Sequence, residues 1–164
     1  MKLNLKDIFE SQTILDKAIQ NKHNVDYIRV YDELKLALFV ELGELANEVR
    51  CFKFWSVKGP SDKAIILEEY VDGIHFICSL SIAKNIDYDF FIPDDIHLLN
   101  KKDLTVHFNK LFSHMTSLND PNGIKEWFKD YLVLGYHLGF TYDDIYKAYF
   151  EKNQINFKRQ EENY

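Results

Sequence analysis

The sequence predicts an all-α protein, and three of its features support that prediction. Only six glycines and three prolines occur among 164 residues, which is too little turn chemistry for a chain of many short strands. Hydrophobic residues make up 46% of the chain, with 13 Phe and 10 Tyr, so the chain has ample material for a core. Apolar residues also recur at steps of three and four, which is typical of packed helices.

The first two helices follow from this apolar spacing. The first is predicted over roughly residues 5–20, and the second, with a clearer period, over about residues 25–54. The Gly59-Pro60 pair marks the break after the second helix, because proline lacks a backbone N–H and its ring clashes with the preceding turn.

The third helix, about residues 63–84, is apolar nearly all round and is therefore predicted to lie in the middle of a bundle. Ser61 or Asp62 can cap it. Thr141 is expected to cap the last helix, with Asp144 at the third position of a capping box. The remaining segments are a connection over residues 85–100 and helices over about residues 102–118, 124–138 and 141–159. The prediction is thus five or six helices and no strand.

The charge and cysteine content narrow the class of protein. Acidic residues outnumber basic ones by 26 to 20, for a formal net charge of −6. Proteins that bind nucleic-acid phosphates usually carry a basic patch and a high pI, so polymeric nucleic acid is not an expected partner. Cys51 and Cys78 have no CxxC spacing and are expected to be buried free thiols. With neither a signal peptide nor a membrane span evident, we expect a cytoplasmic protein of one domain over residues 1–164.

Acidic side chains follow one stripe of the second predicted helix. Glu41, Glu44 and Glu48 lie at steps of three and four, so they share one face about a quarter-turn from the apolar stripe. A solvated acidic face is the ordinary explanation of such a pattern, and the second helix alone does not distinguish it from a functional site.

The third helix makes a functional site the better interpretation. Its polar residues, which include Glu69, Asp72 and His75, fall within about a third of the circumference of an otherwise apolar helix. Carboxylates on a buried helix cost several kcal/mol unless they are protonated or have a partner (about 2–7 kcal/mol even for uncharged polar groups). No lysine or arginine lies near them on the same face of either helix.

A divalent metal ion would reconcile four converging carboxylates that lack a nearby cation. Oxygen ligands from Asp and Glu suit hard cations, so we expect Mg²⁺, with Mn²⁺ as a substitute, held by Glu41, Glu44, Glu69 and Asp72. A di-iron bundle would require Glu-x-x-His on two helices, and His75 instead follows Asp72. Mg²⁺ sites are commonly completed by substrate phosphates, which points to hydrolysis of a phosphate ester or anhydride.

The last helix carries groups suited to phosphate and sugar. Lys152, Asn156 and Arg159 form one stripe at steps of four and three, with Asn153 beside it. Cations and amides in such an arrangement match phosphate oxygens and sugar hydroxyls. A polar, solvated C-terminal helix is the simpler alternative for this segment taken alone.

Taken together, these motifs resemble those of the dimeric all-α dUTPases, within the MazG-like group of nucleoside triphosphate pyrophosphohydrolases. The motifs are, in chain order, Gln12-Thr-Ile-Leu15-Asp16, Glu41-Leu-Gly-Glu44, Phe52-Lys53-Phe54-Trp55, Glu69-Tyr-Val-Asp72-Gly-Ile-His75-Phe76 and Lys152-Asn153-Gln-Ile-Asn156-Phe-Lys-Arg159. The paired carboxylate motifs are shared by the whole group, whereas the other motifs are more specific to the dUTPase branch. Asp16 stands where some members carry Asn, and Asn163 where Gly is usual.

The resemblance implies a multi-helix bundle with a central four-helix metal-binding core, which forms a homodimer. It also implies hydrolysis of dUTP, and of dUDP, with dUMP and pyrophosphate as the products from dUTP. Carried over to this chain, it makes Glu41 the general base and four carboxylates the Mg²⁺ ligands: Glu41, Glu44, Glu69 and Asp72. The implied nucleoside contacts are Gln12, Trp55, His75 and Phe76, and the implied phosphate and sugar contacts are Lys53, Lys152, Asn153, Asn156 and Arg159.

Two alternatives remain open at the level of sequence. One is a MazG-like pyrophosphohydrolase that acts on a different nucleotide. The other is a regulatory module that binds a protein partner on the same fold. His75 and Trp55 also have structural alternatives, His75 as a satisfied core histidine and Trp55 as a core or interface residue.

Overall fold

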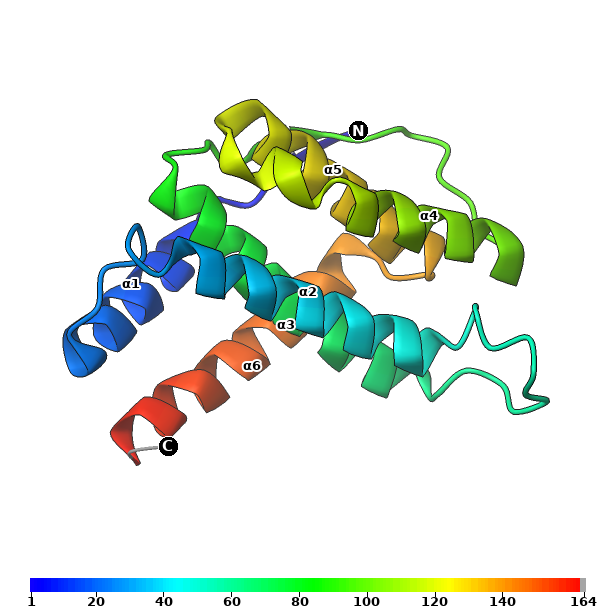
Figure 1. The fold of residues 1–164 in the computed structure, drawn as a ribbon, viewed down its shortest axis with the longest axis horizontal. Helices are drawn as coiled ribbons and strands as arrows, with labels where there is room; N and C mark the ends of the chain where they lie inside the picture. The colour runs from blue at the N-terminus through cyan, green and yellow to red at the C-terminus, as the bar shows by residue number, and fades with distance from the viewer. Residues whose placement is uncertain (163–164) are drawn as a thin grey trace.

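A computed structural model describes residues 1–162 of the chain and shows a bundle of helices (Figure 1). The α-helices are α1 (Lys6–His23), α2 (Tyr31–Val49), α3 (Lys63–Ala83), α4 (Lys101–Ser113), α5 (Pro121–His137) and α6 (Tyr142–Glu161). This architecture confirms the predicted all-α fold class. Asn163 lies outside the described residues.

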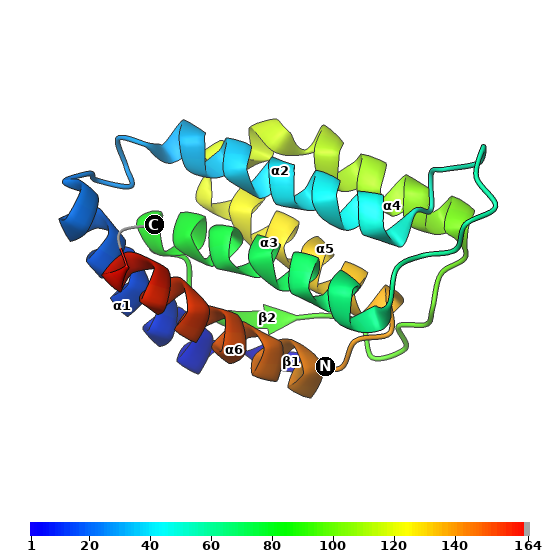
Figure 2. The same cartoon turned by 90° about the horizontal axis from the view of Figure 1, so that it is seen from below.

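Helix α3 occupies the middle of the bundle, as its apolar sequence predicts. It packs against α2, α1, α6 and α5, and Figure 2 shows it between α2 on one side and the α1–α6 pair on the other. Because α3 has neighbours on nearly every side, its polar residues are brought against side chains of three different helices. The candidate site is therefore built around α3.

Helices α3 and α5 are held together by two tyrosines in a reciprocal arrangement. The rings of Tyr70 and Tyr131 stack with centroids 4.8 Å apart. Each hydroxyl donates to the backbone carbonyl of the other residue, at 3.1 Å from Tyr70 and 2.9 Å from Tyr131. The rings fit because glycines face them: a Cβ on Gly73 would meet the Tyr131 hydroxyl, and one on Gly135 would meet the ring of Tyr70.

Helix α2 is shorter than predicted at both ends. It starts at Tyr31 and stops at Val49, with Arg50 in the left-handed conformation at φ 57°. The helix therefore ends ten residues before the Gly59-Pro60 pair, and that pair lies within a long loop over residues 50–62. The sequence prediction was wrong here because Phe52 and Phe54 continue an apolar pattern without belonging to the helix.

A small antiparallel sheet departs from the expectation of no strand. Strand β1 (Lys2–Asn4) pairs with β2 (Asp89–Phe91), with Leu3 opposite Phe90. Both of these side chains are buried, so the pair closes one end of the core. Three-residue strands carry too little alternation to be recognised in a sequence.

The helix ends confirm one predicted cap and correct others. Thr141 and Asp144 form the expected capping box at the start of α6. Asp62 is the N-cap residue of α3 but accepts no side-chain cap bond, and the Ser61 hydroxyl bonds to Glu48 instead. The helix predicted over residues 102–118 ends at Ser113 and continues as a 3₁₀ turn, Met115–Asn119. Helix α5 starts earlier than predicted, at Pro121.

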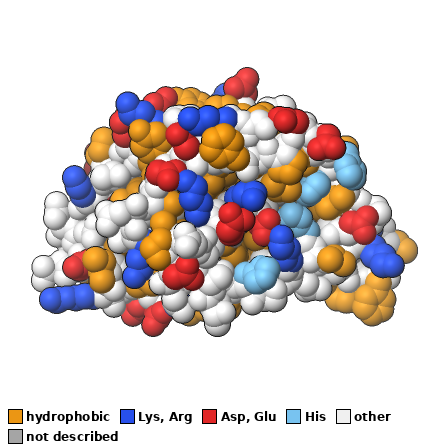
Figure 3. Space-filling model, turned by 90° about the horizontal axis from the view of Figure 1, so that it is seen from above, with side chains coloured by type: hydrophobic (Ala, Val, Ile, Leu, Met, Phe, Trp, Pro, Cys, Tyr) orange, Lys and Arg blue, Asp and Glu red, His pale blue; other side chains and the backbone are white. Residues whose placement is uncertain are grey.

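The surface mixes charges and has one conspicuous apolar end. In the face shown in Figure 3, acidic and basic side chains lie interspersed, and hydrophobic side chains gather at the end where the loop over residues 50–62 lies. Within that loop Phe54 is 93% exposed and Trp55 is 65% exposed. No helix among residues 1–162 is long and apolar enough to cross a membrane. Cys51 and Cys78 are buried free thiols, as expected.

Candidate active site

Three carboxylates from two helices converge between α2 and α3. One oxygen each from Glu41 of α2 and from Glu69 and Asp72 of α3 lie within 4.8 Å of one another. The i, i+3 spacing of Glu69 and Asp72 puts both on the face of α3 that meets α2. Glu44, one turn beyond Glu41, is exposed and lies outside this triplet, although its charge acts on both Glu41 and Glu69.

Each carboxyl group of this cluster is harder to ionise than an isolated one, because it is buried and close to other acidic groups. Burial, followed by the charges of Asp72, Glu44 and Glu69, raises the pKa of Glu41 to about 7. Burial is also the main cause of the raised pKa of Glu69, with Asp72 the strongest charge acting on it. Burial raises the pKa of Asp72 despite an opposing lysine. Such shifts are expected where carboxylates share a site with too little positive charge.

The opposing lysine is Lys152 of α6, and it corrects the expectation that no cation lies near these carboxylates. Its ammonium group lies 2.8 Å from Asp72 and 3.1 Å from Glu68. The helices α2 and α3 indeed supply no such cation, but a third helix packs against α3 and brings one. The charge of Lys152 opposes the rise in the pKa of Glu41, Glu69 and Asp72 and so offsets part of the negative charge of the cluster.

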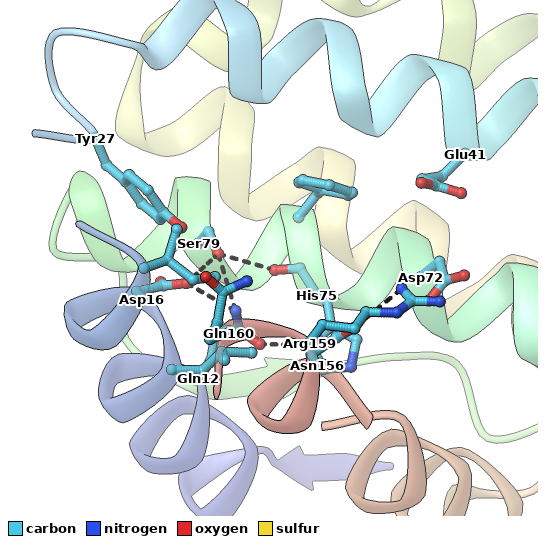
Figure 4. Close-up of a pocket in the computed structure, with 13 residues that line it drawn as sticks. Gln12, Asp16, Tyr27, Glu41, Asp72, His75, Ser79, Asn156, Arg159 and Gln160 are labelled. Carbon is cyan, nitrogen blue, oxygen red and sulfur yellow. Dashed lines mark hydrogen bonds between the residues drawn. The ribbon is translucent and has the colours of Figure 1, made fainter. Parts of the chain in front are cut away.

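A pocket of about 230 Å³ extends from the carboxylates along α3 toward the far end of α1. Figure 4 shows Glu41 and Asp72 at one end, Asp16, Gln12, Ser79 and Tyr27 at the other, and His75, Asn156 and Arg159 between them. Phe76 also lines it. The pocket therefore connects an acidic end to an end of mixed polarity, with a cationic side chain midway.

Gln12 organises the far end of the pocket. Its amide nitrogen donates to Asp16 Oδ1 at 2.8 Å and lies 3.1 Å from Ser79 Oγ. Its amide oxygen accepts from the Tyr149 hydroxyl at 2.8 Å and lies 2.7 Å from His75 Nδ1. These four contacts come from three helices, so Gln12 is held in one orientation.

His75 is a neutral imidazole with one nitrogen available to a ligand. Burial, followed by the charge of Lys152, lowers its pKa to about 3. Because the Gln12 oxygen can only accept, Nδ1 carries the hydrogen and Nε2 carries a lone pair. Within residues 1–162, Nε2 is one of two buried side-chain polar atoms without a hydrogen-bond partner, although His75 is only 6% exposed. This feature favours a ligand contact over a satisfied core histidine.

Helix α6 contributes three further polar residues of the predicted stripe. Asn156 and Arg159 line the pocket, and Asn156 Oδ1 lies 3.5 Å from Arg159. Asn153 is buried, and its side chain bonds to the hydroxyls of Ser11 and Tyr149. Asn156 and Arg159 thus line the pocket, whereas Asn153 holds Ser11 and Tyr149 in place.

Two predicted contacts lie away from this pocket. Lys53 and Trp55 belong to the loop over residues 50–62, where Lys53 bonds to Asn47 and Trp55 packs edge-on against Phe54, with centroids 5.0 Å apart. Within one chain the structure brings together Gln12, Phe76 and His75 at the pocket, but not these two loop residues.

The prediction missed several residues that line or support the pocket, namely Tyr27, Ser79, Gln160 and Tyr149. Ser79 had a detectable signal, because it lies one helical turn after His75 on an apolar helix, just as Asp16 lies one turn after Gln12. Tyr27 and Tyr149 had none, because aromatic residues at helical spacing are usual core components.

Carboxylates at one end of a polar pocket in an all-α bundle indicate a nucleotide hydrolase. Comparison with family models agrees, because the model described as dUTPase matches residues 4–164. The chain belongs to the dUTPase family, in its all-α form, and is a dUTP diphosphatase. Comparison with curated proteins gave no match.

Proposed function

We propose that this dUTP diphosphatase also hydrolyses dUDP, and that it acts with Mg²⁺ held between α2 and α3. The observation that carries the proposal is the convergence of Glu41, Glu69 and Asp72 oxygens within 4.8 Å at one end of the pocket. Like charges so close together are unfavourable unless protons or a cation compensate them. The phosphate chain would lie at this end and the nucleoside at the other.

The donor set fits a hard divalent ion. All three converging groups are carboxylates, and Glu44, whose charge acts on Glu41 and Glu69 from outside this triplet, is our proposed fourth ligand. Oxygen ligands of this kind favour Mg²⁺, with Mn²⁺ as a substitute. When bound, the ion would supply Lewis-acid chemistry: it would neutralise phosphate oxygens and lower the pKa of a water molecule.

Glu41 is our candidate for the general base. Its carboxylate converges with Glu69 and Asp72 at the pocket, so a Glu41 oxygen that does not bind the ion could accept a proton there. In this role a Glu41 oxygen takes the proton of the attacking water. The water oxygen forms the new bond to the α- or β-phosphorus of dUTP while the bond from that phosphorus to the oxygen that bridges the two breaks, which gives dUMP and pyrophosphate.

Helix α6 would hold the charged part of the substrate. Lys152 already forms an ion pair with Asp72. Arg159 lines the pocket that Asp72 also lines. Arginine suits phosphate oxygens through its planar donors, and lysine acts as a point charge. Asn156 would contact the sugar or phosphate, and Asn153 would act by holding Tyr149 and Ser11.

The far end would hold the nucleoside. Gln12 and His75 present a fixed set of hydrogen-bonding atoms, and the half-buried Phe76 offers an aromatic surface for the base or the deoxyribose. Buried polar groups held in one orientation by their neighbours are well suited to selecting a ligand, because an unmatched ligand leaves them unpaired.

We also propose a homodimer. Lys53 and Trp55 reach a nucleotide only if their loop approaches the pocket of a second copy, because within one chain they lie away from it. The exposed rings of Phe54 and Trp55 favour burial against a partner.

A substrate panel tests the proposal. With Mg²⁺ present, we expect dUTP to be hydrolysed at least about a hundredfold faster, in kcat/KM, than dTTP and UTP, and we expect activity to disappear with EDTA and return with Mg²⁺ or Mn²⁺. Preference for another nucleotide would instead support a general MazG-like pyrophosphohydrolase. Full activity in EDTA would contradict the metal-dependent mechanism.

A further inference from the structure

Three of the six histidines of the chain lie together, away from the pocket described above. His107 belongs to α4, His137 to the last turn of α5, and His97 to the connection between β2 and α4. The His137 ring contacts both of the others, with its centroid 5.4 Å from that of His107 and 6.1 Å from that of His97. Figure 3 shows histidine side chains, in pale blue, gathered on this side of the molecule.

Backbone carbonyls determine which nitrogen is available on two of these rings. His137 Nδ1 lies 2.6 Å from the carbonyl oxygen of His97, and His107 Nε2 lies 3.0 Å from that of Asp130. A carbonyl only accepts, so each of these nitrogens carries the hydrogen and the opposite nitrogen of the neutral ring carries a lone pair. Histidines that bind metal ions are held in the same way, because their second nitrogen almost always donates to a carbonyl, a carboxylate or water.

The surroundings of His107 favour its neutral form. Burial lowers its pKa, and the charge of His137 acts in the same direction, against the opposing bond to the Asp130 carbonyl. The other charged groups that act on it are the side chains of Asp130 and Lys110, which pair with each other at 2.7 Å. His107 is therefore neutral at pH 7, which is the form in which imidazole binds a metal ion.

The separation of the rings fits imidazoles arranged around one ion. A Zn–N distance of about 2.0–2.1 Å with tetrahedral angles puts the centres of two coordinating rings about 5 Å apart, close to the 5.4 Å between His107 and His137. Among residues 1–162 only the carboxylate triplet already brings three candidate ligand atoms within 4.8 Å, so the histidines close around an ion by side-chain rotation. His97 is exposed, and its ring can turn without breaking the bond to its backbone carbonyl.

The end of α5 adds a favourable charge and holds the connection in place. His137 lies in the last turn of that helix, where the backbone carbonyls carry a partial negative charge that favours a cation. Two residues later, a Cβ on Gly139 would meet the Leu98 side chain at 3.2 Å. The connection therefore lies against the end of α5, which keeps His97 near the other two histidines.

We propose that His97, His107 and His137 form a binding site for a divalent transition-metal ion such as Zn²⁺, separate from the carboxylate cluster and from the nucleotide pocket. Imidazole nitrogens suit Zn²⁺, whereas Mg²⁺ prefers oxygen ligands, so the two sites differ in the ion that they select. With three protein ligands, the fourth position of the ion is left for water. The bound ion joins the connection over residues 92–100 to α4 and α5.

The test is calorimetric titration of the full chain with Zn²⁺ at about pH 7.5, with saturating Mg²⁺ present. We expect His97→Gln and His137→Gln each to weaken Zn²⁺ binding by at least about tenfold, because even the loss of an indirect contact to a metal ligand costs about 10–100-fold. The matched control is His114→Gln, since His114 is exposed and lies outside the cluster, and it should bind Zn²⁺ like the wild type. Glu69→Gln should also retain this binding, because Glu69 belongs to the carboxylate triplet.

Two further measurements check the site without relying on the stability of a histidine variant. Ligand histidines must be neutral, so the Zn²⁺ affinity of the wild type should fall by at least about tenfold between about pH 7.5 and pH 5.5. Zn²⁺ should also raise the melting temperature of the wild type, and this rise should be absent from His97→Gln, whose substitution lies on the exposed connection.

Three results would overturn the inference: no binding of Zn²⁺ to the wild type at about pH 7.5, equal affinity in the wild type and in both histidine variants, or binding that is lost in Glu69→Gln and retained in the histidine variants. The last result would place the ion at the carboxylates. Failure of the proposed function looks different, because it concerns the dependence of dUTP hydrolysis on Mg²⁺ and on Glu41.

Discussion

Glu41 is the residue on which most of the proposed chemistry depends. It lies beside Glu69 and Asp72, and burial together with these charges raises its pKa to about 7. Glu48, which lies four residues after Glu44 on the same helix, has a different environment, because it accepts a bond from the Ser61 hydroxyl. The two glutamates therefore form a matched pair for mutagenesis.

We expect Glu41→Gln to lower kcat for dUTP by at least about a hundredfold, because the amide cannot accept the proton of the attacking water. Glu48→Gln should retain kcat within about threefold, since Glu48 lies outside the converging triplet. Steady-state kinetics of both variants measure this difference. Equal activities would contradict the role of Glu41 as general base.

Lys152 offers a second residue-scale test, because it shares Asp72 with the proposed metal. Saturating Mg²⁺, at about 100 times its Kd, should stabilise the wild type by about 2.7 kcal/mol, which corresponds to a melting-temperature rise of about 5–10 °C. Lys152→Met should show a larger rise, because removing the competing cation leaves the carboxylates more negative.

Thermal unfolding with and without EDTA measures both shifts. Lys63→Met is the control, since Lys63 pairs with Asp144 away from the cluster, and its shift should equal that of the wild type. A Mg²⁺ effect absent from the wild type, or smaller in Lys152→Met, would contradict a metal site at these carboxylates.

At the scale of elements, the contact between α3 and α5 lies directly beside Asp72 in the sequence. Gly73 follows Asp72 directly and allows the Tyr131 hydroxyl to reach the Tyr70 carbonyl. Gly43 of α2, which lies between Glu41 and Glu44, has open space where a Cβ would be. The same substitution at these two positions therefore has opposite expected effects.

We expect Gly73→Ala to lower the free energy of unfolding by about 1–3 kcal/mol, because the new methyl group would overlap the Tyr131 hydroxyl. Gly43→Ala should raise it by up to about 1 kcal/mol, since alanine favours a helix and meets no neighbour. Urea unfolding followed by circular dichroism measures both. A neutral or stabilising Gly73→Ala would show that the two helices are not packed as described.

At the scale of the whole molecule, the apolar end formed by the loop over residues 50–62 bears on assembly. We expect the chain to form a homodimer in solution, with twice the 19.5 kDa mass of one chain. Phe54→Ser with Trp55→Ser should shift it toward monomer and lower dUTP hydrolysis, because exposed aromatic rings are removed from the proposed interface.

Light scattering coupled to size exclusion gives the mass, and kinetics give the activity. Ile14→Ser is the control, because Ile14 is also exposed but lies on α1. A monomeric wild type would contradict the dimer, and a fully active, dimeric double variant would remove this loop from the interface and from the site.

The sequence by itself determined the fold class and the local placement of the carboxylates. Helical periodicity is a property of short segments, so the i, i+3 spacing of Glu41 and Glu44, and of Glu69 and Asp72, fixes which residues share a face. The apolar circumference of α3 likewise fixed its central position, because such a helix is stable only when it is covered on all sides.

Only the tertiary structure decided which faces meet. Lys152 lies 80 residues from Asp72, and Gln12 lies 63 residues from His75, and local periodicity carries no information on contacts at such separations. The ion pair at the carboxylates and the hydrogen bonds around Gln12, Asp16 and His75 arise where α1, α3 and α6 pack together. Their cause is the packing of whole helices, which no single segment encodes.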